Sequence, residues 1–355
     1  ELGYALQETI INSGVVKELD FDPADYLDEL VEELQLSCPN CGTEWDAPWI
    51  DIGEHFGGPD KRVIMKIPTI NDGQTDFLNL FKLWQIVNQD CCDVTFDFSQ
   101  CHFLRQNAVA FLGGLARLVE SRGRQAQFKW DTLQPDLLKN LKKNTFYKTF
   151  GRGGFVFQGN AVPYREDAVQ HKNELIKYLK NDWIGRGWVY VSRLLSDAIA
   201  GRVWEIYANA FEHAESSIGI FSCGQYYPLQ NLLKLTVIDF GVGIPSNVRL
   251  FLRRHPRARG WSAANCLKWA FKLGTTTKPN GASRGVGLDL LKDFVKINKG
   301  KLEIFSHEGY ALIDGDHESF TNLQTFFEGT LVNITFRCDE SYYHFVSETE
   351  DEPLF

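Results

Sequence analysis

The stretch EIYANAFEHA carries Glu205, Asn209 and His213 on a segment that otherwise reads as a buried helix. A step of four residues rotates a side chain by only about 40° around a helix, so these three groups line up on one face. A carboxylate, an amide and an imidazole in one row are groups that bind ligands and exchange protons. The row is therefore a candidate site, and the alternative is the solvated polar face of an amphipathic helix.

Asp239 follows a strand-like run in LLKLTVIDFGVGIP, whose apolar residues alternate as in a buried strand. Gly241 and Gly243 come shortly after it. Glycine lets the backbone turn tightly and approach a ligand closely, so an aspartate here is well placed to present its carboxylate to a ligand. We predict that this strand end is a second part of the site.

A third candidate segment is LGTTTKPNGASRGVGLDLLKDFV, in which a loop rich in threonine and glycine opens a helix at residues 285–288. Glycines at the start of a helix allow backbone N–H groups and the helix dipole to face a phosphate. The sequence contains no GxxxxGK[ST] motif, so the segment is not a P-loop.

In this order, the three segments resemble the nucleotide-binding domain of the GHKL superfamily, which includes gyrase B, the ninety-kilodalton chaperone, histidine kinases, MutL and anti-sigma kinases. The shared motifs are ExxxNAxxHA, DxGxG, the GTTTK loop and RGxGL, and FFEGTLVNITF corresponds to the closing strand. The resemblance covers residues 185–338. It implies a two-layer α/β sandwich, the Bergerat fold, that binds ATP.

The resemblance also implies roles for individual residues. Asn209 would coordinate Mg²⁺, which bridges the phosphates, and Glu205 matches the general base of the hydrolytic branches. Asp239 would accept a hydrogen bond from the exocyclic amine of adenine, and Thr330 would help through a water molecule. For His213 two roles remain open, a ligand contact and a cap or core hydrogen bond.

The same resemblance assigns the remaining nucleotide contacts. Gly241 and Gly243 would pass beneath the base. A lid would cover the phosphates, and the start of the following helix would supply amides to them, with an arginine nearby. The lid residues are Thr275, Thr276, Thr277 and Lys278, and the residues at the helix start are Arg284, Gly285, Gly287 and Leu288. The implied cofactors are ATP and Mg²⁺.

Residues 59–158 alternate strand-like and helix-like segments, which indicates an α/β layer. Within them, DVTFDFSQCHFLRQNAVAFLGGLARLVESRGRQAQFKW resembles a STAS domain, the fold of anti-sigma factor antagonists. Such antagonists carry an Asp-Ser-Ser-Gly loop with a phosphorylated serine, whereas this chain reads Arg-Gln-Asn-Ala at residues 105–108. Because no hydroxyl is present there to accept phosphate, we expect a docking or dimerising module and not a phospho-switch.

Cys38 and Cys41 form a CxxC turn with a glycine behind it, after a helix-like segment at residues 19–36. This geometry lets two thiolates face one zinc ion. A tetrahedral structural site needs two more ligands, and no second CxxC follows at the usual spacing. The fold would have to supply them from His55, Cys91, Cys92 and Cys101. The alternative is two small buried thiols in a turn.

Composition suggests the boundaries between these parts. FGRGGFVFQGN carries four glycines in a short span, which is more typical of a flexible connector than of a phosphate-binding turn. The predicted parts are an N-terminal helical segment with the CxxC turn at 1–58, a STAS-like domain at 59–158, a linker at 159–184, a GHKL ATP-binding domain at 185–345 and an acidic tail at 346–355.

The composition is that of an ordinary folded protein, with 355 residues of which 44% are hydrophobic and 23% charged. A net charge of −9 argues against a general polyanion binder, because affinity for phosphate backbones comes from clustered Lys and Arg. The arginine-rich run from Arg249 to Arg259 leaves phosphate sensing, nucleic acid or an acidic partner as alternatives to a solvated helix face. The sequence has no apolar run of about 18 residues, no signal-peptide pattern and no secreted disulfide framework among its eight cysteines. We expect a cytoplasmic protein without membrane contact.

Three functions compete on these residues. The one we favour is a Mg²⁺-dependent ATPase that acts as a nucleotide-driven conformational switch for association with a protein partner or a second copy. The second is an anti-sigma-type protein Ser/Thr kinase that acts on a separate STAS partner, and the third is a nucleotide sensor without turnover. A histidine kinase proper is disfavoured, because no His-box helix precedes the domain. By resemblance, such chains occur in bacterial signalling and phage defence.

Overall fold

The computed structural model describes residues 62–89, 92–151, 153, 159–253, 260–271 and 287–348. They lie within one compact unit of the chain, Ile52–Phe355. The predicted CxxC turn at Cys38 and Cys41, the loop 275–278, and the end of the chain at 349–355 lie outside the described residues. Within the described part of the chain, no helix has the length and apolar character needed to cross a membrane.

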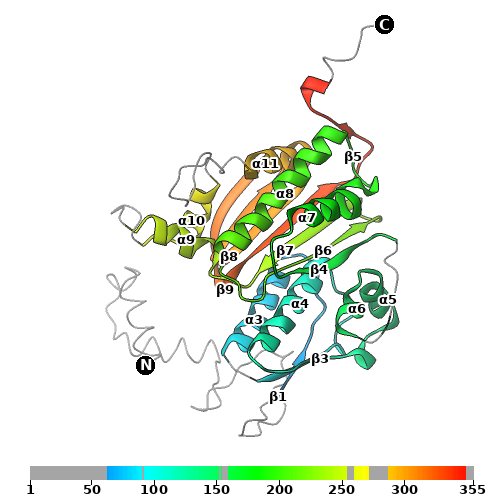
Figure 1. Cartoon of the computed structure of the whole chain (residues 1–355), viewed down its shortest axis with the longest axis vertical. Helices are drawn as coiled ribbons and strands as arrows, with labels where there is room; N and C mark the ends of the chain where they lie inside the picture. Colours follow the sequence, from blue (N-terminus) through cyan, green and yellow to red (C-terminus); the bar gives the residue numbers. More distant parts are fainter. Residues whose placement is uncertain are drawn as a thin grey trace, which may run out of the picture. The chain divides into compact units, whose positions relative to one another are not determined.

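The largest element is a five-stranded antiparallel sheet (Figure 1). Its strands, in spatial order, are β4 (Ala161–Asp167), β6 (Ile220–Tyr227), β7 (Leu232–Asp239), β9 (His317–Arg337) and β8 (Lys301–Asp314). All neighbouring pairs run antiparallel. The central strand, β7, is buried from its second residue to its last. Burial of successive residues means that both faces of the sheet are covered at this strand.

One face of the sheet is covered by α8 (Arg193–His213), α11 (Gly287–Ile297) and α7 (Lys172–Tyr178). The odd-numbered apolar residues of β7 point to this face and share a hydrophobic core with α8. Ser192 caps the start of α8, since its Oγ accepts a hydrogen bond from the Leu195 amide at 3.1 Å. Packing and capping together fix the helix that carries Glu205, Asn209 and His213.

The opposite face of the sheet is covered by α3 (Gln74–Gln89) and α4 (Gln106–Ser121). α4 also contacts a three-stranded parallel sheet of β1 (Arg62–Lys66), β2 (Asp93–Asp97) and β3 (Ala126–Lys129), in that order. Twelve of the sixteen residues of α4 are buried. A helix buried on nearly all sides lies between two layers, and α4 contacts strands of both sheets.

The protein is thus a mixed α/β structure with several sheets, as the sequence predicts. The layering differs from the predicted two-layer sandwich, because helices cover the second face of the five-stranded sheet as well. On that face the even-numbered β7 residues Lys234 and Thr236 contact Asp72 and Gln106, which come from the region predicted as STAS-like. These polar contacts bring together segments more than a hundred residues apart in the sequence.

The range 159–184, predicted as a linker, contributes to the sheet and its core. β4 pairs with β6 at one edge of the sheet. α7 and a π-helical turn, Leu179–Trp183, join the hydrophobic core next to α8. Trp183 is fully buried, and its ring stacks on Phe336 of β9 with centroids 5.1 Å apart. These residues therefore complete the sheet.

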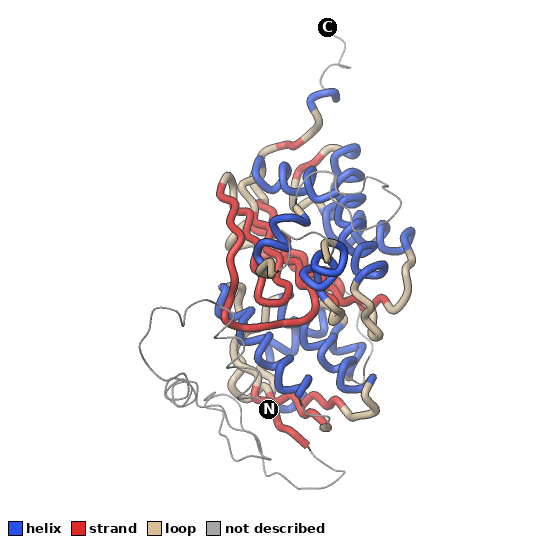
Figure 2. The backbone as a smooth tube through the Cα atoms, turned by 90° about the vertical axis from the view of Figure 1, so that its left-hand side faces the viewer, coloured by secondary structure: helices blue, strands red, loops and turns tan. Residues whose placement is uncertain are grey.

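The other described α-helices are α5 (Pro135–Lys143), α6 (Phe146–Phe150), α9 (Gly243–Phe251) and α10 (Ala263–Ala270). Two short strands, β5 (Tyr190–Val191) and β10 (Tyr342–Tyr343), pair in parallel. Figure 2 distinguishes all of these helices, in blue, from the strands, in red. Of the predicted arginine-rich run, Arg249 and Arg253 are described, whereas residues 254–259 are not.

Candidate functional site

Asp239, Thr330 and Ser306 form a row across three neighbouring strands. Asp239 is the last residue of β7 and lies directly opposite Thr330 of β9, which in turn lies opposite Ser306 of β8. Residues directly opposite in antiparallel strands point to the same face, and here that face is the one covered by α8 and α11. The hydroxyls of Ser306 and Thr330 are 3.2 Å apart. The structure therefore places the predicted residues Asp239 and Thr330 side by side.

Asp239 is a buried carboxyl group, with only 4% of the residue exposed. Burial raises the pKa of Asp239 to about 7, because the charged form loses its hydration. The Gly241 amide opposes this rise by donating a hydrogen bond to Oδ1 at 3.0 Å, and the backbone of Thr330 acts in the same direction. A buried carboxyl that titrates near neutral pH is typical of functional sites.

The loop after β7 is held tightly against the end of α8. Val242 donates its amide N–H to the Ala214 carbonyl at 2.7 Å. A Cβ atom at Gly241 would lie 1.9 Å from that same oxygen, so no larger residue fits. Gly243 has a φ of +72°, and a Cβ atom there would lie 2.2 Å from the Glu328 carbonyl oxygen. Close backbone approach thus requires glycine at both predicted positions.

His307 holds the same loop from β8, and the sequence analysis does not single it out. It lies at an irregularity of the β8–β9 ladder, with a φ of 53°. Its Nε2 is 2.9 Å from the Val242 carbonyl oxygen. Burial lowers the pKa of His307, so the ring is neutral at pH 7, and Nε2 must carry the proton to donate to a carbonyl. No motif marks this residue, because its role arises only from the bulge that turns it toward the loop.

The predicted row on α8 is partly exposed to solvent. Asn209 is exposed, whereas Glu205 and His213 are half-buried. Glu205 pairs with Arg202 at 2.7 Å, and because these side chains are 30% and 32% exposed the pair adds little stability. Asn247 of α9 donates an Nδ2–H bond to the His213 carbonyl oxygen at 2.9 Å. The last turn of α8 is therefore tied to the segment that follows β7.

The predicted phosphate side of the site lies mostly outside the described residues. This holds for Thr275, Thr276, Thr277, Lys278, Arg284 and Gly285. Gly287 and Leu288 form the start of α11, where the backbone alone is described. Within the described ranges, no group of three or more His, Cys, Asp or Glu residues could hold a metal ion. Mg²⁺ at a nucleotide site commonly uses one or two protein ligands together with phosphates and water, so Asn209 fits that kind of site.

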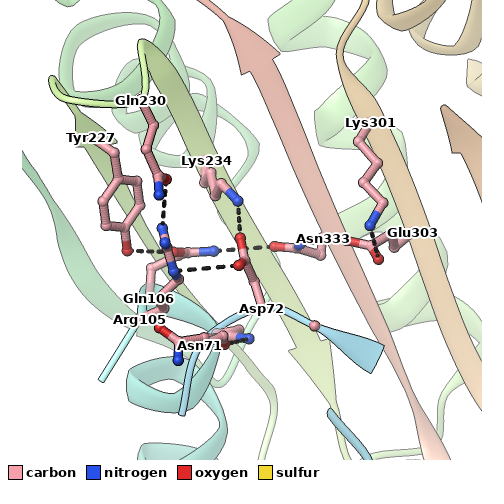
Figure 3. Close-up of polar contacts among 12 residues, drawn as sticks. Asn71, Asp72, Arg105, Gln106, Tyr227, Gln230, Lys234, Lys301, Glu303 and Asn333 are labelled. Atoms are coloured by element: carbon pink, nitrogen blue, oxygen red, sulfur yellow. Dashed lines mark hydrogen bonds and ion pairs between the residues drawn. The ribbon is translucent and has the colours of Figure 1, made fainter. Parts of the chain in front are cut away.

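A second polar cluster lies on the opposite face of the sheet (Figure 3). Gln106, at the start of α4, donates an Nε2–H bond to Asn333 Oδ1 at 3.2 Å and accepts one from the Tyr227 hydroxyl at 2.8 Å. Asn333 in turn donates to Glu303 Oε2 at 2.9 Å. All four residues are buried. Their polar groups are satisfied by one another, which is the condition for a buried network to be stable.

Asp72 adds charge to this cluster. It forms an ion pair with Lys234 of β7, and its Oδ1 lies 3.4 Å from Arg105 Nε. Arg105 also donates to Gln230 Oε1 at 3.2 Å. We refer to Asp72, Arg105, Gln106, Lys234 and Asn333 as the polar cluster. It joins the start of α4 to the central strands, and Arg105 and Gln106 are the first two residues of the Arg-Gln-Asn-Ala stretch at 105–108.

No protein-family model matches this sequence. A comparison with curated proteins also gives no match. The row of Asp239, Thr330 and Ser306, the glycine loop packed against α8, and the polar groups on that helix are therefore the features from which a function can be proposed.

Proposed function

We propose that this protein binds ATP with Mg²⁺ at the site around Asp239 and acts as a nucleotide-driven conformational switch of the GHKL type. The observation that carries the proposal is the position of Asp239. It is a buried carboxyl group at the end of a central strand, opposite Thr330, and it begins a glycine loop closed against α8. The antiparallel sheet with α8 and α11 on one face supports the same assignment.

The chemistry of the row fits one edge of an adenine base. Asp239, when ionised, offers an acceptor to the exocyclic amine in a place where little water competes. Thr330 offers a hydroxyl beside it that can donate or accept. Gly241 and Gly243 bring the loop backbone close to the same place without side chains in the way.

The polar residues of α8 fit the phosphate end. The exposed Asn209 has an amide oxygen that can ligate Mg²⁺, the ion that neutralises phosphate charge. Glu205, one helical turn away, can orient a water molecule and accept its proton as the water attacks the terminal phosphate. Arg202 forms an ion pair with Glu205 at 2.7 Å, which positions the carboxylate on the face of α8.

Residues 62–150 supply a parallel sheet that α4 contacts, which supports a STAS-like assignment for this region. The start of α4 is buried against the neighbouring sheet by the polar cluster. We therefore assign to this region the role of responding to whether nucleotide is bound. The response would change its association with a protein partner or with a second copy of the chain.

The test is incubation of the purified protein with Mg²⁺ and ATP labelled at the γ-phosphate. Wild type is compared with Asp239→Asn and Glu205→Ala, while free phosphate is resolved from labelled protein and ATP binding is measured by calorimetry. We expect Asp239→Asn to abolish binding and Glu205→Ala to keep binding but stop phosphate release. Matched controls are Asp97→Asn, a buried aspartate that ends β2, and Glu174→Ala, an exposed glutamate of α7.

Each other outcome has a defined meaning. Label on this chain or on an added STAS protein would favour the kinase. Binding without release or transfer would favour a sensor. Equal ATP affinity for Asp239→Asn and wild type would contradict the proposed site.

A further inference from the structure

Asp239 and Phe240 are consecutive residues whose side chains lie on opposite faces of the sheet. Asp239 points to the face covered by α8, whereas the ring of Phe240 lies among aromatic rings on the α4 side. Its centroid is 5.4 Å from that of Phe111 in α4, 5.6 Å from Phe327 in β9 and 5.9 Å from Phe221 in β6. A displacement of the backbone after Asp239 must therefore also move a ring that is packed against α4.

Two consecutive glycines of α4 make room for two aromatic side chains. A Cβ atom at Gly114 would lie 2.1 Å from Cε2 of Phe240, and one at Gly113 would lie 2.0 Å from the Tyr164 hydroxyl. Glycine inside a helix is unfavourable relative to alanine, so the pair needs a packing reason, and the rings provide it. Phe240 thus contacts the helix at Gly114 with no side chain between them.

α4 is also anchored at its start. Arg105 and Gln106 are buried in the polar cluster, which fixes the first turn of the helix to the central strands (Figure 3). Gly114 lies about two helical turns further on. A helix held at one end and contacted by Phe240 near its middle can respond to movement of the ring only as a packed unit, because interiors of this density do not deform continuously.

We propose that Phe240 couples occupancy of the Asp239 site to α4 and, through α4, to the three-stranded sheet. A ligand that bonds to Asp239 and to the loop after it changes the position of Phe240 against Gly114. By linkage, a change in α4 alters ligand affinity by the same factor. The response to nucleotide rests on the proposed function, whereas the mechanical link between Gly114 and the loop does not.

The first test needs no ligand. Hydrogen exchange is measured at the amides of Gly241, Val242 and Ile244, each of which donates a hydrogen bond in the structure. Gly114→Ala is expected to speed their exchange by about tenfold, because the new methyl group displaces Phe240. Gly113→Ala introduces a comparable clash from the same helix against β4, and is expected to leave these amides nearly unchanged.

Phe240→Leu supplies the second part of this test. In the Gly114→Ala background it is expected to restore slow exchange of the loop amides, since the shorter side chain relieves the clash with Phe240 and leaves only the wider one, 2.8 Å, with Cδ2 of Phe221. Equal effects of Gly114→Ala and Gly113→Ala on the loop, or no effect of the former, would overturn the link.

The second test uses ATP with Mg²⁺ as the probe and Phe240→Leu alone, which introduces no clash. In wild type, ATP is expected to change exchange of the α4 amides by about fivefold, and in Phe240→Leu ATP binds but this change is lost. An α4 response that persists in Phe240→Leu, or that is absent in wild type despite ATP binding, would overturn the coupling. A wild type that binds no ATP would contradict the proposed function, and the ligand-free comparison would still decide the link.

Discussion

Thr330 lies directly opposite Asp239 on the neighbouring strand, and its hydroxyl is 3.2 Å from that of Ser306. The row therefore places one carboxyl group and two hydroxyls within about two strand spacings, or roughly 10 Å. An ionised carboxylate repels phosphate, so in the proposed function this row would face the base of the nucleotide and not its charged end. The proposal correspondingly assigns the phosphate end to Asn209 and Glu205 on α8.

Asp239 predicts a pH dependence of stability with a defined sign. The folded protein holds this proton up to about pH 7, whereas the unfolded chain releases it near pH 4. The folded state therefore binds more protons in this window, and the contribution of Asp239 to stability falls as pH rises from about 4 to about 7, by up to roughly 4 kcal/mol. Asp239→Asn mimics the protonated form and should be more stable than wild type at pH 8 but similar at pH 4. Urea unfolding of both proteins at the two pH values measures this difference.

Asp97 is the control for that experiment, because its shift has the opposite sign. Burial alone would raise the pKa of Asp97, but hydrogen bonds from Lys129 and Ser99 lower it to about 2. Its stabilising contribution is present above pH 4 and is lost as pH falls toward 2, so Asp97→Asn should destabilise the protein at neutral pH. A stability difference between Asp239→Asn and wild type that does not change with pH would contradict the buried-carboxyl account.

The two hydroxyls of the row are expected to separate binding from folding. Thr330→Val keeps the shape of the side chain and should weaken ATP binding about fivefold, with little change in stability. Ser306 accepts a hydrogen bond from the Ile244 amide at 3.0 Å and donates one to the Gly329 carbonyl at 2.9 Å. Ser306→Ala should therefore lower the free energy of unfolding by about 1–2 kcal/mol. ATP binding is measured by calorimetry and stability by urea unfolding for both variants. If Thr330→Val lowers stability and Ser306→Ala weakens ATP binding, the two hydroxyls have the opposite roles.

The sequence predicts the mixed α/β class and the strand that ends at Asp239, because these follow from local patterns. Alternation over eight residues identifies β7, and glycines at 241 and 243 indicate the tight turn after it. The two-layer sandwich is instead what the GHKL resemblance implies. Only the fold shows that Asp72 and Gln106 contact Lys234 and Thr236 on the second face of the sheet.

Other parts of the site depend on contacts that no short pattern encodes. From the sequence, Gly114 is a residue that only lowers the stability of its helix. The structure shows that the ring of Phe240 packs against it. His307 holds the loop after β7 by a hydrogen bond to the Val242 carbonyl, and an irregularity in the β8–β9 ladder puts it in position to do so. Both relationships join residues far apart in the sequence, and each depends on the register of several strands, which hydrophobic periodicity alone does not specify.

Burial of the cysteine thiols predicts that they react slowly with thiol reagents. Burial raises the pKa of Cys101 and of Cys338 to about 12, and thiols react as thiolates. All five cysteines in the described part of the chain are buried: Cys92, Cys101, Cys223, Cys266 and Cys338. A thiol reagent should therefore modify at most three cysteines rapidly in the native protein, namely Cys38, Cys41 and Cys91. If zinc holds Cys38 and Cys41, rapid modification of these two should require a chelator, and zinc should be found in the purified protein.

The polar cluster predicts a large stability effect from one carboxylate. Asp72→Asn leaves Lys234, whose side chain is only 7% exposed, without its counter-charge, and should lower the free energy of unfolding by about 3 kcal/mol. Asp76→Asn is the control on the same segment, because Asp76 accepts hydrogen bonds from the Asn71 and Gly73 amides without pairing a buried cation, and about 1 kcal/mol is expected there.

The double variant Asp72→Asn/Lys234→Met removes the unpaired charge and keeps an apolar chain of similar length. It should recover most of the stability lost in Asp72→Asn, since replacing both members of a buried pair is far less disruptive than removing one. Urea unfolding gives these free energies, and hydrogen exchange of α4 shows whether its first turn loosens in parallel. If the double variant is as unstable as the single one, Lys234 is not the group that needs the carboxylate. Arg105, 3.4 Å from Asp72, would then be the cation that fixes α4 to the sheet.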